Sequence, residues 1–286
     1  MLARELHEDN RLSWNSATRA HNSHKGDQAG FLRSGGSTLF PEEVELLGDV
    51  SGRRLVHLQC NSGQDSLSLA ALGADVTGVD ISDEAVGFAA RLSAESGIPA
   101  TFTRSDLFDW FDQARTAGDT FDVAFSSYGT IVWLSDLDAW GAGIASVLRP
   151  GGRFVFVEFH PVMGMFDWEW QPKHDYWMRR HAHETFPNGV GDYVRAAGHG
   201  LVPWGYQEGM PEVPDPRRCH QFAWGISDVI GALRGAGLVL DVFREYPYSN
   251  GTVFGARMRE LPGRRFAPPA ELPDFPLMYG IRALKP

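Results

Sequence analysis

The chain has 286 residues and a formal net charge of −10. This length suits one domain with insertions, and a hydrophobic content of 43% suffices for a sizeable core. The negative charge argues against nucleic acid and anionic membranes as partners, because both bind basic surfaces. Two cysteines make no disulfide framework, and no apolar run has the length of a transmembrane helix or signal peptide. We therefore expect a soluble, cytoplasmic protein.

The first 50 residues predict helices and a glycine-rich loop. Residues 2–24 are polar with scattered apolar positions, among them Trp14, which is compatible with a helix. Residues 30–36 contain three glycines that would permit motion of a lid. Pro41 at a first-turn position predicts a short helix over residues 40–47 that leads into the first strand.

Residues 53–82 predict a strand, a tight turn, a helix and a second strand that ends on Asp80. Apolar residues at 55–58 and 76–79 have the composition of buried parallel strands. Between them, Leu67 and its apolar neighbours recur at helical spacing as far as Gly73. The free N–H groups of a helix N-terminus favour a polar or anionic ligand, and a carboxylate at a strand tip can bind both hydroxyls of a ribose.

The turn itself departs from the usual glycine-rich pattern. Only Gly63 remains, and Gln59 and Asn61 stand where other glycines would fall. The pattern predicts a dinucleotide or S-adenosylmethionine (SAM) as cofactor, with a βαβ unit that binds no ligand as the alternative.

Alternating strands and helices continue to residue 160. Ser82 is a candidate N-cap, residues 100–103 read as a third strand, and the apolar run 121–127 reads as a central fourth strand. A turn at 149–152 precedes the fifth strand, 153–159. Because ligands bind at the carboxyl ends of parallel strands, Tyr128, Glu158 and His160 are expected to face one crevice.

The pattern changes between residues 161 and 225. Tryptophan, tyrosine, phenylalanine and histidine crowd this stretch without a regular period. Aromatic side chains can bury a large area, so we interpret the stretch as an ordered insertion that covers the substrate. Its aromatic faces would suit a cationic amine or a flat aromatic acceptor, or form the core of the insertion itself.

The C-terminal part predicts a return to the sheet. Ser227 is expected to cap a helix over 228–236, and residues 238–246 read as a sixth strand. The Pro- and Arg-rich stretch 259–276 is expected to run over the surface, and residues 277–284 read as the final strand. The expected divisions are 1–50 for the lid and lead-in helices, 51–160 for the cofactor-binding core, 161–225 for the insertion and 226–286 for the rest of the sheet.

Two stretches resemble the first two motifs of class I SAM-dependent methyltransferases: residues 57–67 (His-Leu-Gln-Cys-Asn-Ser-Gly-Gln-Asp-Ser-Leu) and residues 72–82. The Leu-Arg-Pro-Gly-Gly turn at 148–152 is also typical of that family. The similarity is strongest to a bacterial small-molecule group with a Leu-Gln-Cys-like motif, and it extends from about Trp14 to Pro161. It implies an α/β fold with a Rossmann-like sheet of seven strands, the last antiparallel. It implies SAM as the cofactor.

The resemblance also implies site residues. Asp80 would bind the ribose and Asp106 the adenine amino group, with capping of the next helix as the alternative role of Asp106. The N-terminal segment would cover the cofactor, with a surface helix as the alternative. The candidate cofactor-binding residues are Gln59, Asn61, Gly63, Asp65, Asp80, Ile81, Asp106, Leu107, Ser126 and Trp14.

Methyl transfer needs alignment of the acceptor with the methyl group and exclusion of water, and it needs a base only for a protonated acceptor. His160 is the first candidate base, because histidine titrates near neutral pH. Tyr128 and His220 are the others, and a structural role is open for each. His181, His183 and the Glu158–His160 pair lack the convergent spacing of a metal site, so no metal is predicted.

These patterns together predict a SAM-dependent methyltransferase that methylates N, O or C of a small-molecule acceptor. Two alternatives remain open. One is an enzyme of the same fold that uses SAM for another reaction, such as intramolecular alkyl transfer. The other is a SAM-binding regulator without turnover. An NAD-dependent oxidoreductase is disfavoured, because the full glycine fingerprint is absent. The acceptor and the oligomeric state are not predicted.

Overall fold

A central sheet organises the computed structural model, which describes residues 2–177, 182–252 and 254–286. The sheet order is β3 (Thr101–Arg104), β2 (Asp75–Asp80), β1 (Arg54–Leu58), β4 (Phe121–Ser127), β5 (Leu148–Phe159), β12 (Met278–Leu284) and β8 (Val239–Tyr246). β12 is antiparallel to both neighbours, whereas the pairs among β1 to β5 are parallel. This topology confirms the expected Rossmann-like sheet with an antiparallel last strand.

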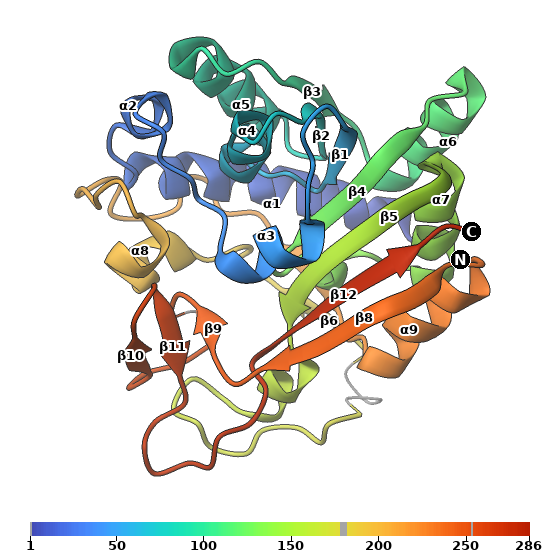
Figure 1. Cartoon of the computed structure of the whole chain (residues 1–286). Coiled ribbons are helices and arrows are strands. Elements are labelled where there is room, and N and C mark those ends of the chain that lie inside the picture. Colours follow the sequence, from blue (N-terminus) through green and yellow to red (C-terminus); the bar gives the residue numbers. More distant parts are fainter. Residues whose placement is uncertain (1, 178–181, 253) are drawn as a thin grey trace.

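Helices cover both faces of the sheet (Figure 1). One face carries α3 (Pro41–Leu47), α4 (Gln64–Ala71) and α5 (Asp83–Ser96), and the other carries α6 (Leu107–Ala117), α7 (Leu137–Val147) and α9 (Ile226–Gly235). Trp140 of α7 is fully buried, with its ring 5.4 Å from Phe154 and 5.5 Å from Phe156. These contacts form because alternate residues of β5 face α7. The residues between them are buried on the other face of the sheet, so the strand is a continuous apolar run in the sequence.

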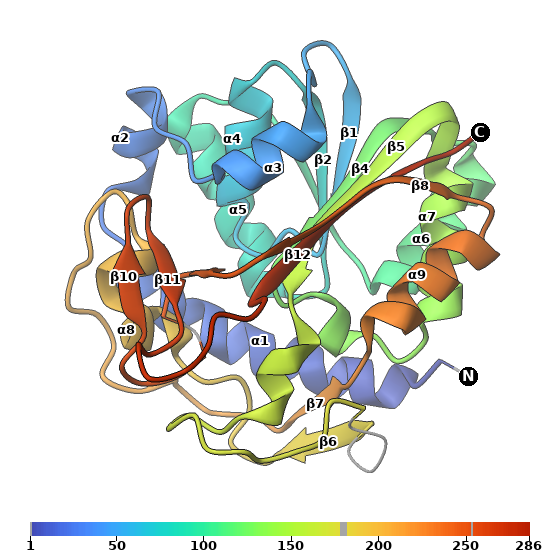
Figure 2. The same cartoon turned by 60° about the horizontal axis from the view of Figure 1, so that its bottom comes forward.

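The N-terminal helix α1 (Arg4–Ser23) crosses below the carboxyl ends of the strands (Figure 2). It contacts α5 of the core and β7 of the insertion, and α2 (Gln28–Arg33) follows it. Its polar face is partly buried, with His7 and Asn10 both below 5% exposed. Buried polar side chains on a helix require partners, so α1 is bound to the domain through specific hydrogen bonds.

The insertion contains short regular elements. β6 (His183–Phe186) pairs antiparallel with β7 (Cys219–Phe222), and α8 (Tyr193–Ala197) lies between them in sequence. Short 3-10 helices form within it at η2 (Pro161–Met165) and η4 (Gly198–Leu201), and another, η1 (Ile131–Trp133), lies outside it in the loop after β4. Trp170 is 3% exposed and donates a hydrogen bond to the Ala256 carbonyl, so part of the aromatic content packs against the C-terminal part of the chain.

Two expectations for the C-terminal part were wrong in detail. Residues 259–276 do not simply run over the surface: β10 (Arg259–Leu261), β11 (Arg265–Ala267) and β9 (Ser249–Asn250) form a small sheet, and Phe266 is buried. The tight turn at 262–264 pairs β10 with β11, which composition alone could not indicate. Helix α9 begins at Ile226, where Asp228 accepts a hydrogen bond from the Gly225 N–H, so Ser227 is not its cap.

No helix of the described residues is long and apolar enough to span a membrane.

Gly63 is needed for packing as well as for its backbone conformation. Its φ is +79°, and a Cβ there would lie 2.6 Å from the Ala89 Cβ. Gly97 has a similar φ of +72°, but a Cβ there would meet nothing within 4 Å.

The two glycines form a matched pair. Gly97→Ala should cost only the left-handed strain of about 1–2 kcal/mol. Gly63→Ala should lower the free energy of unfolding by about 1–3 kcal/mol more, because the added methyl group also overpacks the α4–α5 contact. Urea denaturation of both variants measures the difference, and equal midpoints would contradict this view of the turn.

Candidate functional site

A cavity of about 1090 Å³ lies at the carboxyl ends of β1, β2, β4 and β5. Its walls come from the sheet edge, α1, the insertion and the small β9–β11 sheet. Pockets for single drug-sized ligands measure roughly 300–1,000 Å³. This cavity therefore has room for a cofactor and a small acceptor together.

The turn after β1 keeps the backbone of a glycine-rich turn with few glycines. Gln59 and Asn61 have φ values of 56° and 47°, in the left-handed region where glycine is usual. Both line the cavity. Gln59 donates to the Thr130 carbonyl at 2.9 Å, while its Oε1 has no partner among the described residues. Gly63 is not at the cavity surface, so its role is in packing.

Asp80 lies at the tip of β2 and faces the cavity. Its Oδ2 accepts from the Asn61 N–H and its Oδ1 from the Ser82 N–H, both at 2.8 Å. Burial raises the pKa of Asp80 to about 6, although these amide hydrogen bonds oppose the shift. The Ile81 N–H also approaches this carboxylate, and since a carboxylate offers about four lone-pair sites, acceptor capacity is left for a ligand.

Asp106 is used by the protein itself. Its Oδ1 accepts from the Phe108 N–H at 2.9 Å and pairs with Arg4, and its Oδ2 contacts His7 Nδ1 at 2.8 Å. The capping role of Asp106 is therefore realised, together with a link to α1. His7 Nε2 lines this end of the cavity without a described partner. Because Nδ1–H donates to the carboxylate, Nε2 is left as an acceptor.

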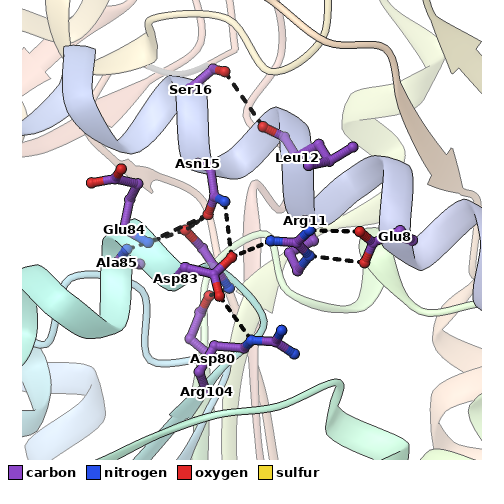
Figure 3. A network of polar contacts seen from close by, with 11 residues as sticks. Glu8, Arg11, Leu12, Asn15, Ser16, Asp80, Asp83, Glu84, Ala85 and Arg104 are labelled. Atoms are coloured by element: carbon purple, nitrogen blue, oxygen red, sulfur yellow. Dashed lines mark hydrogen bonds and ion pairs between the residues drawn. The ribbon is translucent and has the colours of Figure 1, made fainter.

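Polar contacts hold α1 across the cofactor side of the core (Figure 3). Arg11 pairs with Asp83 at the start of α5, and Asn15 Nδ2 donates to the same carboxylate at 3.0 Å. Arg104 of β3 contacts Asp83 at 2.9 Å from the opposite side. Trp14, also on α1, lines the cavity with its ring 5.3 Å from Trp133. α1 thus forms part of the wall of the cavity.

Glu158 is a structural carboxylate, although the sequence indicated only that it would reach the crevice. It is 2% exposed and accepts from the backbone N–H groups of Gly129, Thr130, Ile131 and Phe159. Burial raises its pKa, against the effect of these four hydrogen bonds. The carboxylate therefore fixes the loop after β4, in which Tyr128 has a φ of 45°.

The three candidate catalytic residues differ in position. Tyr128 lines the cavity, and its hydroxyl has no partner among the described residues. His160 also lines it, but Nδ1 accepts from the Val162 N–H and Nε2 lies 3.1 Å from Glu245, so both nitrogens are engaged. His220 lies outside the lining of the cavity and contacts Asp9 and Thr185.

The remaining candidates divide in the same way. Ile81, Leu107 and Asp65 line the cavity. Ser126 does not, because its hydroxyl is turned to Thr130 Oγ1 at 3.1 Å. Asp65, in the first turn of α4, accepts a hydrogen bond from the Thr38 hydroxyl.

Several cavity residues carried no signal in the sequence. They are His7, Lys25, Thr38, Asn250 and Arg264, which lie far apart in the chain. Lys25 follows α1, and burial lowers its pKa to about 8 against the attraction of Asp65 and Asp192. Its ammonium has no ion-pair partner among the described residues, so it presents a cation to the cavity.

Within the described ranges, no three His, Cys, Asp or Glu side chains gather in a way that could hold a metal ion. His181, weighed above as a ligand, lies outside those ranges.

Solved structures share this fold. The superposition on a SAM-dependent methyltransferase from Mesorhizobium loti includes 87% of this chain and 99% of the other, with a TM-score of 0.56 and 20% sequence identity. A putative SAM-dependent methyltransferase from Listeria monocytogenes covers 86% and 96%, with a TM-score of 0.55 and 17% identity. Fold and sheet order therefore define a protein with the class I methyltransferase architecture.

Sequence comparison shows what the core is similar to. Residues 56–152 match the family described as methyltransferase domain. A ubiquinone biosynthesis O-methyltransferase from Aromatoleum aromaticum is 32% identical over 113 residues, or 40% of this chain. Another from Rhizobium etli is 26% identical over 127 residues, or 44% of this chain. The chain spans about half the length of these relatives, 47% and 49%. Residues 56–152 are thus similar to methyltransferase domains, and the solved structures that share the fold are described as SAM-dependent.

The four amides bound by Glu158 suggest a test. Glu158→Gln should lower the free energy of unfolding by roughly 2 kcal/mol or more, because an amide NH₂ would face backbone donors that need an acceptor. Glu245→Gln is the control, since that side chain is 49% exposed and its pair with His160 should matter little. Thermal or urea denaturation measures both, and equal effects would show that Glu158 does not hold the loop.

Proposed function

We propose that this protein transfers the methyl group of SAM to a nitrogen, oxygen or carbon atom of a small-molecule acceptor. The observation that carries the proposal is the cavity at the carboxyl edge, which has Asp80 on its floor and space for two ligands. The net charge of −10 further favours a small acceptor over a nucleic acid. Two free, buried cysteines support a cytoplasmic location.

The residues present fit SAM along the floor of the cavity. Asp80 has acceptor positions free for the two ribose hydroxyls, and His7 Nε2 can accept from the adenine amino group in place of the occupied Asp106. At the other end, Lys25 and Asp65 offer opposite charges to the carboxylate and ammonium of the methionine part. When bound, SAM supplies a methyl group on a sulfonium, which is a good leaving group.

The acceptor side favours a positioning role for Tyr128. Burial raises the pKa of Tyr128 well above its usual range, so the phenol stays protonated at neutral pH and donates a hydrogen bond. Its partnerless hydroxyl can orient an acceptor atom in the cavity. His160 would have to give up a hydrogen bond to serve as base, so we assign it a structural role at the start of η2.

The first test is selective binding. S-adenosylhomocysteine (SAH) at about 100 times its dissociation constant should stabilise the protein by about 2.7 kcal/mol, and NAD should not. Differential scanning calorimetry measures both. Release of SAH from SAM in the presence of a metabolite extract then distinguishes an enzyme from a regulator. Equal stabilisation by NAD, or none by SAH, would refute the cofactor assignment.

The second test concerns the charge on Asp80. The ionised form accepts the ribose hydroxyls, so protonation below its pKa of about 6 should weaken SAH binding as pH falls, by up to tenfold per pH unit. Asp80→Asn should bind SAH at least tenfold more weakly at pH 7.5 and lose this pH dependence. Isothermal titration calorimetry between pH 5 and 7.5 measures both effects.

Asp75→Asn is the matched control for that test, because Asp75 is exposed at the opposite end of the same strand. It should leave both affinity and pH dependence unchanged. If Asp80→Asn binds SAH as the wild type does, Asp80 is not the ribose ligand.

A further inference from the structure

The small β9–β11 sheet places two polar side chains in the wall of the cavity. Asn250 is the last residue of β9 and pairs with Arg265 of β11, and Arg264 stands just before β11 in the hairpin turn. Asn250 and Arg264 both line the cavity, whereas Arg265 does not and pairs instead with Glu42. The sheet therefore gives one arginine a partner within the protein and presents the next one to the cavity.

The guanidinium of Arg264 is held in place but keeps free donors. It lies 4.1 Å from the centre of the Phe40 ring, and Nη2 donates to the Thr38 carbonyl at 3.3 Å. No carboxylate among the described residues forms an ion pair with it, so most of its five N–H donors are unused. Its φ of 62° is a conformation that costs a non-glycine residue roughly 1–2 kcal/mol.

Asn250 and Tyr128 add buried polar atoms without partners. Asn250 is 2% exposed, and neither its Nδ2 nor its Oδ1 has a hydrogen bond within the described protein. The Tyr128 hydroxyl makes no well-formed hydrogen bond among the described residues either, although the buried carboxyl of Glu43 lies near it. Leaving such a group unsatisfied costs about 1–3 kcal/mol, so these atoms favour a polar ligand at this wall. Phe159 and Phe254, which stack edge to face at 4.5 Å, also line the cavity and provide an apolar surface.

We propose that the acceptor carries a carboxylate, and that the guanidinium of Arg264 and the side-chain amide of Asn250 bind it. This inference rests on the proposed methyl transfer, and it names the class of acceptor. A planar guanidinium with free N–H donors matches a carboxylate in geometry and charge. The Asn250 amide adds a donor for that carboxylate, and its carbonyl can accept from a neighbouring hydroxyl or amine of the same molecule. The aromatic walls would hold the apolar part of the acceptor.

SAM itself carries a carboxylate, which is the competing ligand for this cation. The cavity offers a separate cation for it, because Lys25 lies on the α1 side and responds to the charges of Asp65 and Asp192. Asp65 also attracts the charge on Arg264, but the guanidinium of Arg264 contacts Phe40 and Thr38, which precede α3. We therefore assign Lys25 to the cofactor and Arg264 to the acceptor, and the experiment must tell the two carboxylates apart.

The test uses the full chain saturated with SAH. Benzoate and phenylacetate serve as carboxylate probes, and benzamide and phenylacetamide are their uncharged twins. Titration calorimetry should show that the carboxylates bind at least tenfold more tightly than the amides. Arg264→Gln should weaken carboxylate binding at least tenfold and leave the amides unaffected, while SAH affinity stays within about twofold. Arg234→Gln, on the exposed surface of α9, is the charge-matched control and should change neither affinity.

Each other outcome overturns the inference. If the carboxylates and amides bind equally, or neither class binds to the SAH complex, the wall is not a carboxylate site. If Arg264→Gln weakens SAH and benzoate in parallel, Arg264 belongs to the cofactor. Failure of the wild type to bind SAH at the outset would refute the proposed function instead, so the two failures are distinguishable.

Discussion

Backbone amides that donate to buried carboxylates shape the floor of the cavity. Asp80 accepts from the turn after β1, and Glu158 from the loop after β4. Burial disfavours the charge on both groups and raises their pKa values, and the amide hydrogen bonds offset part of this cost. The two segments that these bonds fix contain Gln59, Asn61 and Tyr128, all in left-handed conformations at the cavity wall. The site thus depends on these carboxylates.

The chain divides the work of the cavity between distant segments. The core strands and α1 provide the groups suited to a nucleoside, and α1 is bound to the core through Asp83 and Asp106. The insertion and the β9–β11 sheet close the opposite wall, where Asn250 and Arg264 present polar atoms together with Tyr128 of the loop after β4. This division explains how a common cofactor domain can serve a specific acceptor, because the second wall can vary without disturbing the first.

The sequence predicted those features that local pattern controls. The apolar runs located β4 and β8 to within a residue or two, and Asp80 followed from its place at a strand end. The same reasoning could not find His7, Asn250 or Arg264, because their positions depend on packing between segments more than 100 residues apart, such as the contact of Arg264 with Phe40. It also could not tell that the rings of His160 and His220 are engaged by Glu245 and Asp9.

A crystal structure of the SAH complex would test the central claim most directly. The account predicts both ribose hydroxyls within hydrogen-bonding distance of the Asp80 carboxylate and the adenine amino group at His7 Nε2. It also predicts that the wall formed by Asn250 and Arg264 remains accessible beside the sulfur atom. SAH bound outside this cavity, or with its ribose away from Asp80, would contradict the account.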